Sequence, residues 1–317
     1  MKRFALLVLG AGLLLGCQKD DILFVKADSE IGRLVQEQAP ATQRFPFALN
    51  QPQSLRTAGG ATLSFPANSF RLPDGQTLAT GQAELRVREN YAVPDMLLAD
   101  MPTTALHGQL LISGGEFNIQ VWQGTTRLRL PPSAGTASGG PGLALSSPIP
   151  TAGLDTTRMQ LWQQPTRTFA PAGIDSSGWR PVGATVRVTA AGQYTVTLPL
   201  DSIGNWNIDQ FWHAYQHNGT VNAAVEVPAG ASETRVYFRP VGYNGLARAR
   251  SSSSVVASTR FTSLLPLGAA VVAVVLQARE GQLYYGTQTV TTQAGQVIQP
   301  VLEPLAEAEI IRRIRLL

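Results

Sequence analysis

Three carboxylates between residues 201 and 226 are the only candidates for catalysis that the sequence offers. Asp201, Asp209 and Glu226 lie near an aromatic cluster, in a chain without a nucleophile elbow, a phosphate-binding loop or a zinc-protease motif. Hydrolysis of a glycosidic bond requires two carboxyl groups on either side of the sugar. Spacing along the chain does not establish that arrangement, so we expect no catalytic residue. A surface or periplasmic enzyme that acts on polysaccharide is the alternative to a non-catalytic protein.

The aromatic residues of the same stretch have two interpretations. Aromatic rings on a β-sandwich can stack on a glycan, or they can fill the core, which is the commoner location for side chains of this size. The residues that could take the ligand-stacking role are Trp206, Trp212 and Tyr215. In that role their partner would be a glycan, and a surface protein is the other class of partner that the sequence leaves open.

Two histidines, His213 and His217, have the spacing that chelates a metal ion from one face of a helix. Their neighbours alternate with a period of two, which predicts a strand, and four residues along a strand separate two side chains by about 13 Å. The whole chain contains 3 His and 1 Cys, so few further ligands are present. We therefore predict no metal site and no cofactor.

The single cysteine, Cys17, follows a segment that is typical of a secretory signal peptide. Residues 1–3 are basic at Lys2 and Arg3, and residues 4–15 form an apolar stretch too short to span a bilayer. Leu14-Leu15-Gly16-Cys17 resembles the bacterial lipobox, in which cleavage before the cysteine exposes it for acylation. The sequence thus predicts a lipoprotein signal peptide over residues 1–16 and a lipid-modified, palmitate-bearing Cys17. Several acyl chains on this residue would anchor the protein to the membrane almost permanently.

The residues that follow Cys17 form a candidate export signal. Lys19, Asp20 and Asp21 place one basic and two acidic side chains directly after the cysteine. This triplet is similar to the surface-export signal of lipoproteins from Bacteroidota-type bacteria, and a generic polar tether is the alternative. We expect residues 17–44 to form the lipidated tether of an outer-membrane protein that is exposed at the cell surface.

Composition excludes several classes of protein. The chain has 317 residues, of which 44% are hydrophobic and 15% are charged. This is enough apolar material for a core, so wholesale disorder, collagen and a coiled coil are excluded. The formal net charge is +4, but the arginines are scattered along strand-like runs. Nucleic-acid binding requires basic residues clustered on one stripe, and we therefore expect no nucleic-acid partner.

From about residue 45 the hydrophobic pattern has a period of two, which is typical of antiparallel strands with one buried face. We predict a mainly β protein of two or more antiparallel β-sandwich modules, Ig-like or carboxypeptidase-regulatory-like. A Gly/Ser/Pro-rich stretch over 133–152 suggests an N-terminal β module over 45–150 and a C-terminal β region over 151–302. Within the first module, residues 106–112 and 116–122 are expected to form a hairpin around a Ser-Gly-Gly turn.

Three further segments have recognisable patterns. Ile31, Leu34 and Val35 follow a candidate cap at Ser29 and predict a turn or two of helix. The Val-rich run over 267–277 is too short for a membrane span and predicts a buried strand. Residues 303–317 have a helical period and predict a short C-terminal helix that packs on its own domain, with a partner-binding or membrane-surface helix as the alternative.

A wider family resemblance is carried by two stretches. Residues 204–211 (GNWNIDQF) are similar to a Gly-Trp-x-Asn-x-Asp-x-Phe signature of Bacteroidota-type surface lipoproteins, although Ile208 and Gln210 stand where that signature has Cys and Arg. Residues 65–70 (FPANSF), followed by Asp-Gly and Thr-Gly, resemble the N-terminal β module of the same family and, more distantly, modules of ankyrin and netrin-receptor type. The resemblance covers most of residues 55–317 and implies β-sandwich modules, but no activity. Together with the anchor, it favours a non-catalytic binding or scaffold protein.

Replacing Lys19, Asp20 and Asp21 together by Ala is expected to leave acylation intact but to retain the protein inside the cell envelope. Acylation needs only the residues up to Cys17, and the small change in charge has little effect on the folded body. Protease accessibility on intact cells, at equal abundance in the membrane fraction, measures the effect. Cys17→Ala, which should abolish acylation and leave an unprocessed or soluble species, is the control. Equal cleavage of the wild type and the triple variant would contradict the export signal.

Overall fold

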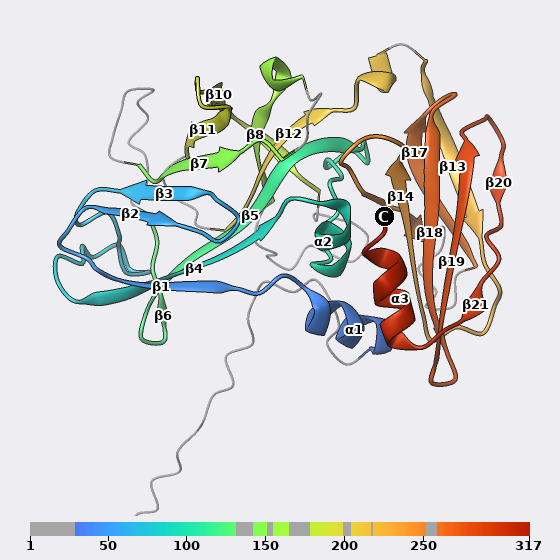
Figure 1. Ribbon diagram of the computed structural model, residues 1–317, viewed down its shortest axis with the longest axis horizontal. Coiled ribbons are helices and arrows are strands. Elements are labelled where there is room, and N and C mark those ends of the chain that lie inside the picture. Colours follow the sequence, from blue (N-terminus) through green and yellow to red (C-terminus); the bar gives the residue numbers. More distant parts are fainter. Residues whose placement is uncertain are drawn as a thin grey trace, which may run out of the picture.

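The protein consists of two β-sandwiches that lie side by side, with three helices between them (Figure 1). The computed structural model describes residues 29–130, 142–150, 155–164, 178–198, 204–216, 218–251 and 259–317. The predicted mainly β class is confirmed. The candidate lipidation and export residues, Cys17 and 19–21, lie outside the described residues.

The first sandwich is built from two antiparallel sheets. Sheet 1 has seven strands, in the order β1 (Gln43–Ala48), β4 (Gln82–Asn90), β5 (Leu111–Gln123), β12 (Asn205–Phe211), β8 (Gln160–Gln164) and β9 (Arg180–Thr185), with β6 (Thr126–Arg127) beside β5. Sheet 2 has five strands, in the order β10 (Arg187–Val188), β11 (Gln193–Thr197), β7 (Ala144–Pro148), β3 (Thr62–Phe65) and β2 (Gln53–Arg56). Their facing side chains form one apolar core.

The second sandwich uses the remaining strands. Sheet 3 has four strands, in the order β16 (Arg250–Ser251), β17 (Arg260–Pro266), β13 (Thr220–Glu226) and β20 (Val297–Ile298). Sheet 4 has five, in the order β15 (Ala247–Arg248), β14 (Glu233–Pro240), β18 (Ala270–Arg279), β19 (Gln282–Thr291) and β21 (Glu303–Pro304). The pairing of β13 with β20 is parallel and all others are antiparallel.

The boundary between the sandwiches lies between β12 and β13, not at residues 150–151. Strand β7 precedes residue 150 and pairs with β11, which follows it. Likewise β5 precedes residue 150 and pairs with β12, which follows it. Strands from both sides of residue 150 therefore share both sheets of the first sandwich. The Gly/Ser/Pro-rich stretch 133–152, which the sequence suggested as a linker, contains strand β7 of the first sandwich, so its composition does not mark a module boundary.

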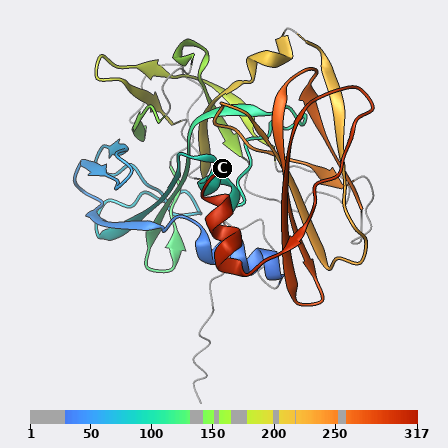
Figure 2. The ribbon, with the colours of Figure 1, turned by 45° about the vertical axis from the view of Figure 1, so that its right-hand side comes forward.

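Sheet 4 is buried on both of its faces. Along β18, Val271, Ala273 and Val275 pack into the core between sheets 3 and 4, whereas Val274 and Leu276 pack against the helices. Figure 2 shows the helices on the side of sheet 4 that faces the first sandwich. A strand covered on both faces reads as a continuous apolar run, which explains the predicted buried strand over 267–277.

The three helices are short, and they come from distant parts of the sequence. They are α1 (Glu30–Gln38), α2 (Val93–Leu98) and α3 (Glu307–Ile314). The Ser29 cap is confirmed, since the amide of Gly32 donates a hydrogen bond of 3.0 Å to Ser29 Oγ. Ile31 of helix α1 is buried. Helix α1, which lies within the expected tether over 17–44, is therefore part of the folded body. None of the helices in the described residues is long and apolar enough to cross a bilayer.

The C-terminal helix is shorter than the sequence pattern indicated. Helix α3 begins at Glu307, because residues Glu303–Pro304 pair with β19 as strand β21. Ile310 and Ile314 are fully buried in the cluster that covers sheet 4. The helix therefore packs on its own domain, as predicted.

A buried charge cluster joins the end of α2 to sheet 4. Asp100, whose side chain is 1% exposed, accepts a hydrogen bond of 2.9 Å from the hydroxyl of Tyr237. Arg248 Nη1 lies 3.2 Å from both carboxylate oxygens of Asp100, and Arg235 Nη1 lies 3.4 Å from Oδ2. A charge buried in this way is tolerated only when it is paired, so these contacts hold α2 in place on the sheet.

Asp100→Asn is expected to lower the free energy of unfolding by about 3 kcal/mol, because it leaves the buried guanidinium of Arg235 without one of its counter-charges. Asn tolerates the left-handed backbone at this position, where φ is 51°. Asp95→Asn in the adjacent helix α2 is the control, since its partner Arg315 is 45% exposed and such a pair contributes at most about 1 kcal/mol. Urea denaturation measures both, and equal losses would contradict the role of the buried cluster.

Candidate functional site

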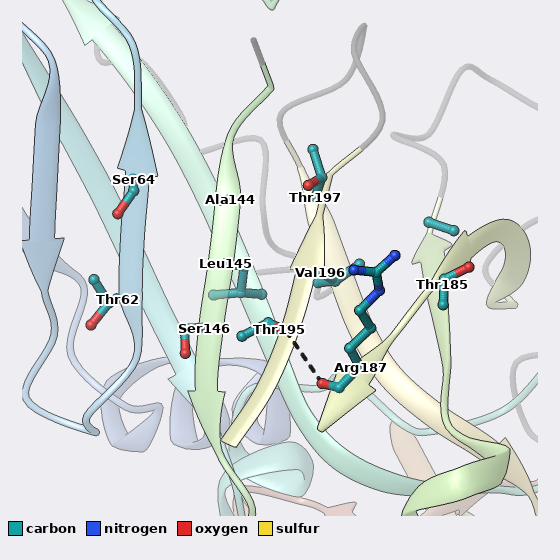
Figure 3. A pocket seen from close by; sticks show the side chains of 11 residues that line it. Thr62, Ser64, Ala144, Leu145, Ser146, Thr185, Arg187, Thr195, Val196 and Thr197 are labelled. Carbon is teal, nitrogen blue, oxygen red and sulfur yellow. Dashed lines mark hydrogen bonds between the residues drawn. The ribbon is translucent and has the colours of Figure 1, made fainter. Parts of the chain in front are cut away.

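The outer face of sheet 2 is hollowed, and just over half of the residues that line the hollow bear a hydroxyl group (Figure 3). It has a volume of about 390 Å³. The hydroxyl-bearing residues that line it are Thr62, Ser64, Ser146, Thr185, Thr195 and Thr197. One charged side chain, Arg187, completes this hydroxyl-lined hollow.

The alternation of side chains along each strand places the hydroxyls outside. In β3, Leu63 points into the core while its neighbours Thr62 and Ser64 point outward, and the same alternation places Leu145 of β7 and Val196 of β11 inside. Each strand therefore contributes an apolar residue to the sandwich core and small polar residues to the hollow.

The register of the strands aligns these side chains into a row. Ser146 lies opposite Thr62 of β3 and opposite Thr195 of β11. Thr195 in turn lies opposite Arg187 of β10. Adjacent strands are about 4.8 Å apart, so the row from Thr62 through Ser146 and Thr195 to Arg187 crosses four strands and is about 14 Å long.

Several polar groups of the hollow are free to contact a ligand. Ser146 Oγ donates to Gln193 Oε1 at 2.9 Å, and Thr195 Oγ1 lies 3.4 Å from the carbonyl oxygen of Arg187. Within the described part of the chain, the hydroxyls of Thr62, Thr185 and Thr197 and the guanidinium of Arg187 have no hydrogen-bond or ion-pair partner. With respect to the described residues, these groups are available to solvent or to a bound molecule.

The aromatic residues predicted to stack on a ligand lie elsewhere. Trp206 is buried in the core of the first sandwich and Trp212 in the core of the second. Tyr215 is half-buried, and its hydroxyl accepts from the amide of Leu110 at 2.9 Å and donates to the carbonyl of Leu264 at 2.8 Å. The ligand-stacking role is therefore wrong for the two buried tryptophans, and all three rings help to hold the cores together.

The two candidate catalytic carboxylates that the structure describes, Asp209 and Glu226, do not flank a common cleft. Asp209 is buried in the first sandwich, whereas Glu226 lies on the surface of the second, where Arg260 Nη1 is 2.5 Å away. Asp201 and His217 lie outside the described residues. His213 begins a short 3-10 helix (His213–Gln216) just after β12, not a strand, and its ring packs against Tyr243.

Asp209 has a buried partner that the sequence analysis missed. Both Asp209 and Glu116 of β5 are 0% exposed, and Asn207 bridges them: its Nδ2 atom lies 2.5 Å from Asp209 Oδ2 and 3.4 Å from Glu116 Oε1. Asn90 Nδ2 donates to Glu116 Oε2 at 3.2 Å. Burial raises the pKa of both carboxyl groups well above their usual range, and the neighbouring charge of Asp209 raises the pKa of Glu116 further.

Glu116 was missed because the expected hairpin at Ser-Gly-Gly does not form. Residues Leu111–Gln123 are one continuous strand, β5, and the register shifts opposite Asn207 and Asp209. Gly114 is needed for close packing, since a Cβ there would lie 2.7 Å from the ring of Tyr194. A glycine pair inside a strand marks a bulge or a close contact as often as a turn.

Comparison with known proteins assigns no relative: no protein-family model matches the chain, and no curated protein matches its sequence. The function must therefore be argued from the two polar clusters themselves. The carboxyl pair of Glu116 and Asp209 is sealed from solvent, whereas Arg187 and Thr197 of the hollow are exposed. Of these two clusters, the hollow is the one that a ligand can reach without an opening of the fold.

Glu116→Gln is expected to become progressively more stable than the wild type as the pH rises above about 4.5. The raised pKa keeps a proton on the folded carboxyl pair, and unfolding releases this proton. Between the unfolded and folded pKa values, the free energy of unfolding of the wild type therefore falls by up to about 1.4 kcal/mol per pH unit. Gln cannot titrate, so the variant loses the contribution of Glu116 to this pH dependence and keeps that of Asp209. Urea midpoints at pH 4, 6 and 8 measure the difference.

The surface carboxylate Glu226 provides the control for this pH dependence. Glu226→Gln removes an exposed carboxylate whose partner, Arg260, is 46% exposed, so its effect on stability should be small at all three pH values. A stability difference between Glu116→Gln and the wild type that stays constant from pH 4 to pH 8 would show that Glu116 does not retain a proton in the folded state.

Proposed function

We propose that this protein is a lipoprotein of the outer membrane, exposed at the cell surface, that binds a saccharide without catalysing its breakdown. The observation that carries the proposal is the hydroxyl-lined hollow, in which Thr62, Thr185 and Thr197 have no partner among the described residues. The lipobox at Cys17 and the export signal at 19–21 support the location.

The chemistry of the hollow suits a polyhydroxyl ligand. A Ser or Thr hydroxyl donates one hydrogen bond and accepts others, as each hydroxyl of a sugar does. A row of such groups can therefore exchange hydrogen bonds with successive sugar hydroxyls. The row through Ser146 is held by the pairing of β3, β7 and β11, so little conformational entropy is lost when a ligand binds.

The positions of the carboxylates favour binding over hydrolysis. A polysaccharide-acting enzyme needs two carboxyl groups that face the sugar from opposite sides. Asp209 is directed into a buried pair with Glu116, and Glu226 is paired with Arg260 on the other sandwich. The lining of the hollow supplies hydroxyl groups and a guanidinium instead, which are groups that bind a sugar but do not cleave it.

Ser146→Phe is expected to weaken saccharide binding at least about tenfold, because a large ring at the centre of the row excludes sugar hydroxyls from their partners. Binding of the full-length protein to an array of bacterial and plant polysaccharides measures the effect. Thr289→Phe is the control, since Thr289 is another hydroxyl-bearing strand residue, is exposed, and lies on β19 of the second sandwich.

Two results would contradict the proposal. Equal binding by Ser146→Phe and Thr289→Phe would exclude the hollow as the site, and wild-type protein that binds no polysaccharide would point to a surface-protein partner. Shortening of the bound polysaccharide, measured by size-exclusion chromatography, would favour the enzymatic alternative. Melting temperatures of both variants close to that of the wild type exclude misfolding as the cause.

A further inference from the structure

The hollow carries a single charge, at one end of its hydroxyl row. Arg187 is the one charged residue among those that line it, and the others are hydroxyl-bearing or aliphatic. In Figure 3 its side chain runs along the strands, and the guanidinium lies between Val196 and Thr185. An acid group of a ligand at this end would lie beside the guanidinium of Arg187. No carboxylate in the lining competes with that acid group for the guanidinium.

The guanidinium of Arg187 is available, unlike that of many arginines in this protein. Arg44 pairs with Glu84, Arg260 with Glu226 and Arg313 with Glu303, at distances of 2.5–2.9 Å. Arg187 is exposed on the short edge strand β10, and its guanidinium has no ion pair with any described residue. An arginine left unpaired beside a polar hollow is free to pair with an anionic group of a ligand.

We infer that the hollow selects saccharides that bear an acid group, and that Arg187 recognises this group. This inference rests on the proposed function and names its substrate class. A guanidinium presents planar donors that match the two oxygens of a carboxylate or sulfate. Arg187 lies opposite Thr195, in line with Ser146 and Thr62. A sugar chain along the row thus places its hydroxyls over the threonines and an acid group at Arg187.

The inference predicts a preference for acidic over neutral chains of the same length. Short polygalacturonate and alginate chains are the carboxylate probes, and dextran sulfate is the sulfate probe. Their neutral counterparts are the carboxyl-reduced chains and dextran. Calorimetric titration of the full-length protein in detergent should give at least about tenfold tighter binding of an acidic chain than of its neutral counterpart, the factor typical of a charge-assisted hydrogen bond. The probe that binds identifies the acid group as carboxylate or sulfate.

Three variants separate Arg187 from the general charge of the protein. Arg187→Gln should remove the preference for the acidic chain while leaving the weaker binding of the neutral chain unchanged. Arg187→Lys should keep part of the preference, because it retains the charge without the planar donors. Arg129→Gln is the control: Arg129 is an exposed arginine of the first sandwich that neither lines the hollow nor belongs to its row of aligned side chains, so its loss should change nothing.

The outcomes distinguish failure of this inference from failure of the proposed function. Equal affinity for acidic and neutral chains, with binding of both abolished by Ser146→Phe, would overturn the inference and leave the saccharide-binding site in place. Equal losses in Arg187→Gln and Arg129→Gln would also overturn it, because general electrostatic attraction would then explain the preference. Absence of binding to every chain, or binding that Ser146→Phe does not change, would overturn both.

Discussion

Burial of both faces of sheet 4 is the constraint on which the rest of the architecture depends. One face is closed by sheet 3, and the other by α1, α2 and α3, which come from the beginning, the first sandwich and the end of the described chain. The charge of Asp100, paired with Arg235 and Arg248, pins the end of α2 to this sheet. Since α2 follows β4 directly, the same contacts join the two sandwiches.

This arrangement leaves sheet 2 as an open face. Sheet 1 packs against it from inside, and no helix in the described part of the chain covers its outer side (Figure 1). A sheet supported on one face only can present a fixed row of side chains to solvent, and its register sets their spacing. The hydroxyl-lined hollow thus combines a rigid support with polar groups that the fold itself does not use.

The protein also keeps polar groups where no ligand can reach them. Glu116, Asn207 and Asp209 lie on buried strands of sheet 1, where burial favours a protonated carboxyl pair over two charges. Such a pair makes stability depend on pH. The two polar clusters therefore differ in solvent access: the carboxyl pair is buried, whereas Arg187 is exposed.

Local patterns in the sequence determined the strands, the cap of α1 and the buried run of β18, because alternation and capping depend on residues close together in the chain. They also predicted the mainly β class. Only the tertiary structure decided which strands share a sheet, and with that it moved the module boundary from residue 150 to the segment before β13. It paired Asp209 with Glu116, placed Trp206 in a core, and brought Arg187 into line with Thr62. These contacts join residues tens of positions apart. They depend on which strands pair and in which register, and a local sequence pattern does not determine either.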